Sequence, residues 1–76
     1  MEKAIFKKYE DGYYTFIFDS GLEMIFEEVH PKVLYQYDLR NDPSLLGKSF
    51  EIAFTEIFDD SDEDFVIYRI ERLQKL

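Results

Sequence analysis

The 76-residue chain contains no cysteine and no tryptophan, and it has only three glycines and two prolines. Without cysteine it can form neither a disulfide framework nor a zinc site built on thiolates. The glycines are scattered, so they form no glycine-rich loop of the kind that binds nucleotides. No apolar run approaches the roughly 20 residues of a transmembrane helix. The first residues lack the layout of a signal peptide, and we therefore expect a cytoplasmic protein.

Positive charge is also scarce. Nine Lys and Arg residues stand against 17 Asp and Glu residues, which gives a net charge of −8. Nucleic-acid backbones and anionic membranes attract positive surfaces, so we expect no membrane association and regard nucleic acid as an unlikely partner. A basic protein partner suits this charge better.

Aromatic residues are plentiful, with eight Phe and six Tyr in a chain that is 46% hydrophobic. Each buried aromatic side chain removes on the order of 150–250 Å² from water. We therefore expect one domain over residues 1–76, with a core that needs neither a metal nor a disulfide for its stability.

Only residues 30–39 carry a helical pattern. Pro31 suits the first helical position, which places His30 at the N-cap. Val33, Leu34 and Tyr37 share one face of the expected helix, and the Asn41–Pro43 turn cluster ends it. An extended loop with a single 3₁₀ turn is the alternative.

Five strand patterns surround this helix. The three before it cover residues 3–9, 13–18 and 22–29, and the two after it cover 48–58 and 65–74. Asp11-Gly12 predicts a tight hairpin turn. Alternation puts one set of side chains on the inward face: Phe16, Phe18, Leu22, Met24 and Phe26. At the C-terminus Ile70, Leu73 and Leu76 recur every third residue, which also fits a helical tail.

The order of three strands, a helix and two strands predicts an all-β fold with one short helix, a five-stranded OB-like barrel. An SH3-like barrel is an alternative, but its helical turn usually precedes the last strand. A third possibility is an α+β fold with the helix packed on an antiparallel sheet.

An acidic loop, Asp59–Asp64, separates the last two strands. Asp60, Asp62, Asp64 and Glu71 fall at positions 1, 3, 5 and 12 of an EF-hand loop. However, Phe65 occupies the position that requires glycine, and the flanking segments are strands. We therefore predict a solvated hairpin tip, with no metal and no cofactor.

No pattern indicates an enzyme. His30 is the only histidine, and no serine lies in a nucleophile-elbow motif. Catalysis by His30 would require a nucleophile or an acid beside it. We expect His30 to act as a cap and the protein to have no catalytic activity.

The candidate binding residues are Tyr13, Thr15, Ile17 and Ile25, on the sheet face opposite the phenylalanines. This face favours a protein-binding module, or a homodimer formed through Tyr13, Ile17 and Ile25.

The alternative function is binding of single-stranded nucleic acid, because OB folds stack bases over this region. A basic strip of Lys7, Lys8, Arg69 and Arg72 would assist, if the first and last strands are neighbours. Glu23 and Glu27 would oppose it.

The second half of the chain resembles a group of short uncharacterised bacterial proteins with a compact β-barrel. The resemblance rests on Tyr37–Leu39, Leu45–Ile52, the acidic loop and Phe65–Ile70. It implies a cytoplasmic OB-like barrel that stands alone, and it implies no activity for any residue.

Overall fold

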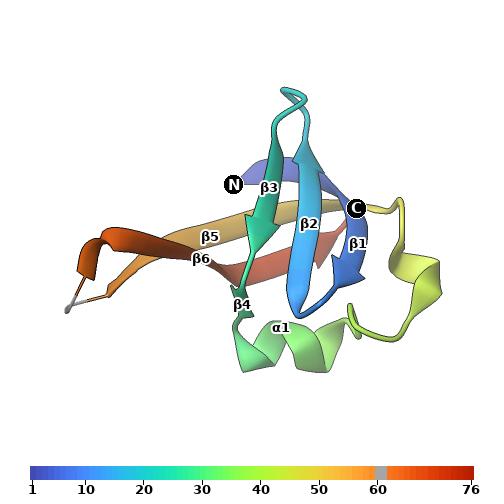
Figure 1. The fold of residues 1–76 in the computed structure, drawn as a ribbon. Coiled ribbons are helices and arrows are strands. Elements are labelled where there is room, and N and C mark those ends of the chain that lie inside the picture. Colours follow the sequence, from blue (N-terminus) through green and yellow to red (C-terminus); the bar gives the residue numbers. More distant parts are fainter. Residues whose placement is uncertain (60–61) are drawn as a thin grey trace.

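The computed structural model describes residues 1–59 and 62–76, without the side chains of 59–64. The described residues form a mainly β structure with one short α-helix (Figure 1). Its elements are β1 (Glu2–Glu10), β2 (Tyr13–Phe18), β3 (Glu23–Phe26), β4 (Glu28–Val29), α1 (Pro31–Gln36), the 3₁₀ turn η1 (Pro43–Leu45), β5 (Ser49–Asp59) and β6 (Asp62–Lys75). No helix in the described ranges has the length and apolarity needed to cross a membrane.

The strands form one sheet in the order β3-β2-β1-β5-β6-β4. All pairings are antiparallel except that of β4 with β6, which is parallel. The expected all-β fold with a short helix is therefore confirmed.

The predicted five-stranded barrel is not confirmed, because the sheet has six strands and does not close. The segment predicted as one strand over 22–29 is divided between β3 and β4. The physical reason is a change of partner: Phe26 still pairs with Tyr14 of β2, whereas the Glu27 N–H donates to the Tyr68 carbonyl of β6.

The β1–β2 hairpin turns through two residues with positive φ, Asp11 (54°) and Gly12 (87°). Two successive positive φ angles belong to the tight turns that match the twist of antiparallel strands. Glu10 and Tyr13 pair on either side of this turn, as the Asp-Gly signal predicts.

Two β-bulges shift the alternation of side chains. In β1, Phe6 pairs with Phe16 and Lys8 with Thr15, so Lys7 is the extra residue. A bulge of this kind moves the following residues by one position. Phe6 and Tyr9, three residues apart, consequently both pack into the core.

The bulge in β6 explains the period of three near the C-terminus. Ala53 pairs with Arg72 and Phe54 with Ile70, which leaves Glu71 as the extra residue. Ile70 and Leu73 are therefore both buried within one strand. The helical tail considered for this segment is wrong, because β6 continues to Lys75.

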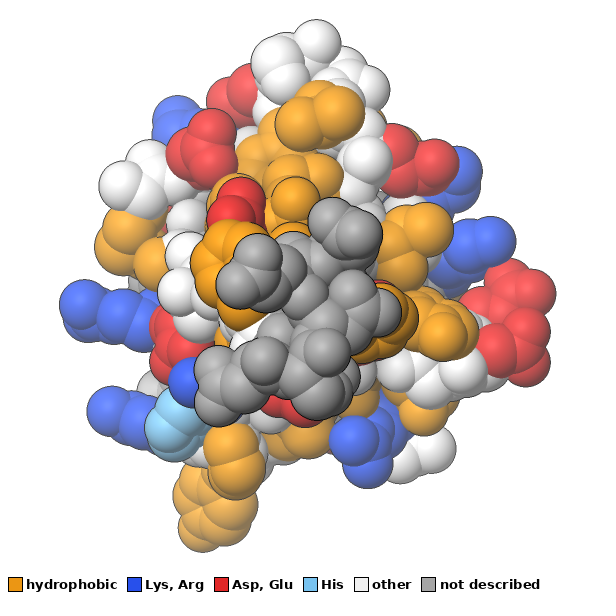
Figure 2. Space-filling model, turned by 60° about the vertical axis from the view of Figure 1, so that its left-hand side comes forward, with side chains coloured by type: hydrophobic (Ala, Val, Ile, Leu, Met, Phe, Trp, Pro, Cys, Tyr) orange, Lys and Arg blue, Asp and Glu red, His pale blue; other side chains and the backbone are white. Residues whose placement is uncertain are grey.

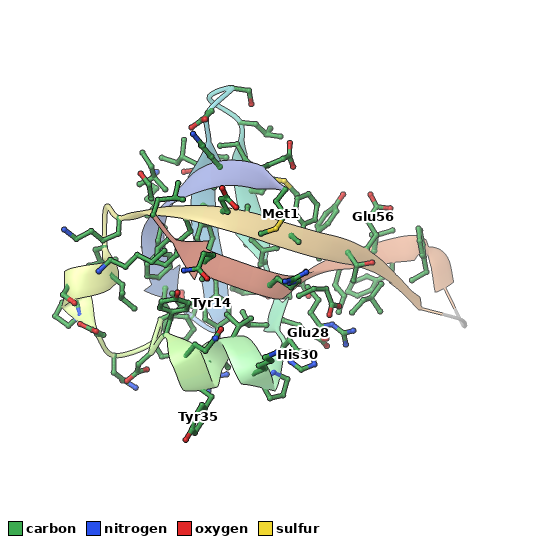
Figure 3. All side chains as sticks on the ribbon, turned by 180° about the vertical axis from the view of Figure 1, so that it is seen from behind. Met1, Tyr14, Glu28, His30, Tyr35 and Glu56 are labelled. Carbon is green, nitrogen blue, oxygen red and sulfur yellow. The ribbon has the colours of Figure 1, made fainter. Side chains whose placement is uncertain are left out.

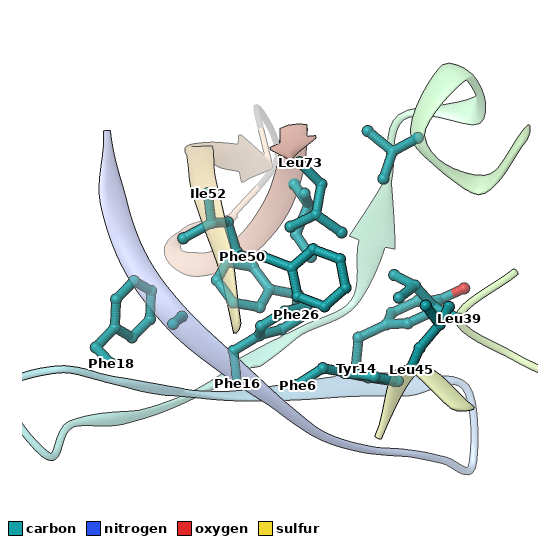
Figure 4. Packing of buried hydrophobic residues seen from close by; sticks show 13 residues of the cluster. Phe6, Tyr14, Phe16, Phe18, Phe26, Leu39, Leu45, Phe50, Ile52 and Leu73 are labelled. Carbon is teal, nitrogen blue, oxygen red and sulfur yellow. The ribbon is translucent and has the colours of Figure 1, made fainter. Parts of the chain in front are cut away.

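Buried aromatic rings form the centre of the core (Figure 4). The Phe16 ring lies 5.1 Å from Phe6, 5.9 Å from Phe26 and 6.2 Å from Phe50, measured between centroids. The last two contacts are edge-to-face, an arrangement that the ring quadrupoles favour. Four strands thus meet at one side chain.

Leu22 was predicted to face inward and does not, since 58% of it is exposed. Its carbonyl accepts the Phe18 N–H in the hairpin that extends beyond the other strands at the top of Figure 1. Alternation alone does not reveal that this end of the hairpin projects past the core. Met24, on the same face, is only partly buried.

The helix α1 is shorter than predicted, although its start is correct. His30 Nδ1 accepts the Lys32 N–H at 3.1 Å, and Pro31 opens the helix. Val33 is buried against the sheet, but Tyr37 already has an extended backbone. Tyr37 Oη instead accepts the Lys75 N–H, which ties the end of the helix to β6.

The far halves of β5 and β6 leave the other strands and extend as a two-stranded arm, to the left in Figure 1. Within this arm Ile57 pairs with Ile67, and Phe58 pairs with Val66. Phe58 and Phe65 are more than half exposed. Figure 2 looks onto this end of the molecule and shows hydrophobic side chains around the undescribed region.

The two leucines Leu22 and Leu73 allow a matched test of the core. We expect Leu73→Ala to lower the free energy of unfolding by about 2–5 kcal/mol, because Leu73 is only 5% exposed. Leu22→Ala should cost no more than about 0.5 kcal/mol at its exposed position. Urea unfolding followed by circular dichroism measures both losses. Equal losses would contradict the register of β6 and of the β2–β3 hairpin.

Candidate functional site

The four residues predicted as a binding site lie on one face of the sheet, which we call the outer face of β1–β3. Thr15 pairs with Ile25, and Ile17 pairs with Glu23 on one side and Ile5 on the other. In a strand, residues two apart point to the same side, so Tyr13 joins this face. Its main apolar members are Ile5, Tyr13, Ile17 and Ile25.

Part of this outer face is hollowed into a depression of about 290 Å³. Its lining residues are Lys8, Glu10, Asp11, Tyr13, Thr15 and Ile25. The structure therefore brings three of the four predicted residues to one depression. Ile17 lies outside it, one row further along β2.

Thr15 contributes little accessible surface, because only 4% of it is exposed. Tyr13 and Ile25 differ in this respect, with exposed fractions of 46% and 54%. A partner that approaches the face would therefore meet Tyr13 and Ile25 first. Thr15 forms the floor between them.

An ion pair crosses this face. Lys7 Nζ donates to Glu23 Oε1 at 2.6 Å. Because β2 lies between β1 and β3, these two side chains have to meet above β2. The bulge at Lys7 gives β1 an additional outward residue from which this bridge starts.

The second lysine near the face is also paired. Lys8 Nζ lies 3.1 Å from Glu10 Oε2. Lys7 and Lys8 thus each have a carboxylate partner at the margin of the apolar residues. The charges of Lys7 and Lys8 are largely balanced locally, which reduces their attraction for phosphate groups.

The basic strip considered in the sequence is not formed. It required β1 and β6 to be neighbours, whereas β5 lies between them. Arg69 instead donates through Nε to Glu71 Oε1 at 2.7 Å, and its Nη1 lies 4.0 Å from Glu28 Oε2. The predicted stacking surface therefore has no continuous band of cations beside it.

Sequence reasoning missed Ile5, which joins the outer face and is 40% exposed. Its position depends on the pairing of Ile5 with Ile17 in the hairpin. A count back from the Asp-Gly turn misplaces Ile5, because the bulge at Lys7 adds one residue. The pairing register, not the composition, places this residue.

Most ligands of the EF-hand hypothesis belong to the acidic loop, whose side chains lie outside the described residues. Its twelfth position, Glu71, is described and binds Arg69. Within the described part of the chain, no group of three or more His, Asp or Glu side chains is arranged to hold a metal ion.

The Lys7 ammonium lowers the pKa of the Glu23 carboxyl below its ordinary value, first through the hydrogen bond and then through its charge. A lowered pKa means that the folded state favours the ionised carboxylate. The resulting stabilisation is present above the ordinary pKa of glutamate and is lost as the pH falls through the folded-state pKa.

We expect Lys7→Gln to raise the pKa of Glu23, because the substitution removes the cation and its charged hydrogen bond. The loss of stability should be larger at neutral pH than in acid, where Glu23 is protonated in both proteins. NMR titration of the side-chain carboxyl measures the pKa. Lys48→Gln, which removes a lysine outside this face, is the control. An unchanged Glu23 pKa in Lys7→Gln would disprove the bridge.

Comparisons of this chain with protein-family models, with curated proteins and with solved structures found no match.

Proposed function

We propose that this chain is a small binding module that recognises another protein through the outer face of β1–β3. The observation that carries the proposal is the arrangement of that face. Exposed apolar side chains occupy its centre, and paired charges, Lys7–Glu23 and Lys8–Glu10, lie around and across them. An apolar centre with a polar rim is the usual anatomy of a protein–protein interface.

Single-stranded nucleic acid is the less favoured ligand. Base stacking on aromatic side chains needs a positive groove along the phosphate backbone. The outer face offers one exposed aromatic residue, Tyr13, and the nearby Lys7 and Lys8 are already paired. The net charge of −8 further opposes a polyanion.

Charge also favours a foreign partner over a second copy. Two copies would bring together two chains of net charge −8, whereas a basic protein would be attracted over several ångströms. The partner that best fits the face therefore presents an apolar patch with basic residues around it.

We also propose that the sheet forms an OB-like barrel and that the protein acts in the cytoplasm. Three features support the barrel: the meander β1–β2–β3, the helix α1 before β5, and the consecutive strands β3 and β4, which pair with β2 and β6 respectively. The two ends of the sheet are thus joined by a single residue, Glu27. In OB folds the face of the second and third strands is a common ligand site.

The test is affinity capture from a nuclease-treated lysate of the source organism, with the full chain as bait. Ile25→Lys places a cation at the centre of the outer face. Tyr35→Lys makes the same change in charge on α1, where Tyr35 is 93% exposed and points away from the sheet (Figure 3). We expect one protein to be recovered with the wild-type and Tyr35→Lys baits and to be lost with Ile25→Lys.

Circular dichroism establishes that both variants are folded. Recovery that is unchanged in Ile25→Lys would contradict the assignment of this face. Recovery that disappears on nuclease treatment would replace the protein partner with nucleic acid. Dimerisation of the purified wild-type protein that Ile25→Lys abolishes would show that the partner is a second copy.

A further inference from the structure

A cavity lies between α1 and the C-terminal half of β6, apart from the outer face of β1–β3. Its volume is about 420 Å³, which is within the range of small-molecule sites. None of its lining residues belongs to the depression beside Tyr13. Met1 and His30, labelled in Figure 3, are among them.

The cavity combines an apolar base with a polar margin. Val33 of α1 and Leu73 of β6 line it and are 2% and 5% exposed, so they form its base. Gln36 and Gln74 line it from the same two elements and are exposed. Their amides are both donors and acceptors of hydrogen bonds.

The charged side chains around this cavity are predominantly cationic. Lys32 comes from α1 and Arg72 from β6. The single carboxylate in the lining, Glu71, accepts the Arg69 Nε–H at 2.7 Å and is thereby neutralised. Figure 2 shows the histidine, in pale blue, with Lys and Arg side chains beside it. This local excess of positive charge contrasts with the net charge of −8.

The helix cap fixes the tautomer of the neutral His30 ring. Its Nδ1 accepts the Lys32 N–H, so in the neutral ring the hydrogen is on Nε2. His30 therefore has an N–H donor and no acceptor left for a ligand at the cavity. This free donor suits an anion.

We propose that this cavity binds a small organic anion, a carboxylate or a phosphate attached to an apolar group. Lys32 and Arg72 contact the anionic group, and Arg72 offers the forked donors that match both anions. The His30 Nε2–H adds a further donor. The apolar group rests on Val33 and Leu73. The site is independent of the protein-binding function proposed above.

The test is a titration of the full ¹⁵N-labelled chain with phenyl phosphate, benzoate and benzylamine, followed by NMR. We expect saturable shifts of the Lys32, Gln36 and Gln74 amides with one or both anions, and none with benzylamine. A response to phenyl phosphate alone would identify phosphate as the anion, and a response to benzoate alone would identify carboxylate. Absence of shifts with both anions would overturn the proposal.

Arg72→Gln and Lys32→Gln should each lower the affinity for the anion by about tenfold or more, because each removes a hydrogen bond from a charged donor. Lys48→Gln makes the same change in charge away from the cavity and should leave the affinity unaltered. Both lining residues are exposed, so we expect the variants to remain folded. Equal binding of benzylamine, or unchanged binding in Arg72→Gln combined with Lys32→Gln, would show only apolar adsorption.

Discussion

The packing of Phe16 against three other phenylalanine rings is the interaction on which the remainder of the structure depends. The rings come from β1, β2, β3 and β5, so this single cluster joins four strands. A chain of 76 residues buries a smaller share of its surface than a larger domain does, and this one has no disulfide to compensate. Aromatic side chains supply the most buried area per residue, which explains their abundance in so short a sequence.

The two bulges adapt the strands to this core. Without an extra residue at Lys7, Phe6 and Tyr9 could not both face inward, and the same holds for Ile70 and Leu73 around Glu71. A bulge also increases local twist, which a small sheet needs in order to wrap around its contents. On the outer face the bulge at Lys7 has a second effect, because it supplies the cation that reaches Glu23.

The sequence was sufficient to predict the elements whose signals are local. Asp11-Gly12 located the first hairpin, and the His30-Pro31 pair located the start of α1. Alternation along β2 correctly placed Tyr14, Phe16 and Phe18 toward the core, although Thr15 on the opposite face is also buried. These features depend on backbone conformation within a few residues, and so they can be recognised without knowledge of the fold.

Features that depend on distant pairing could not be predicted in the same way. Leu22 satisfies alternation yet lies beyond the core, because the β2–β3 hairpin extends past the neighbouring strands. The division of residues 22–29 into two strands reflects a change of partner at Glu27, which no local pattern records. The basic strip failed for the same reason, since its existence depended on which strands are neighbours. The α1–β6 cavity, likewise, is produced by tertiary packing alone.

The protein has a net negative charge, but positively charged side chains occur at defined places on its surface. Lys7 and Lys8 are paired at the outer face, whereas Lys32 and Arg72 gather at the α1–β6 cavity. The arm formed by β5 and β6 presents apolar residues without a covering element among the described residues. An isolated two-stranded ribbon is only marginally stable in water, so the arm depends on its continuity with the sheet.

The central claim is that the outer face of β1–β3, and not the arm, binds the protein partner. The most direct measurement is an isoleucine methyl NMR spectrum of the full chain, recorded with and without the captured protein. The account predicts that the signals of Ile17 and Ile25 shift on binding, while that of Ile70 in the core stays in place. Shifts confined to Ile57 and Ile67 would place the interface on the arm and contradict the account.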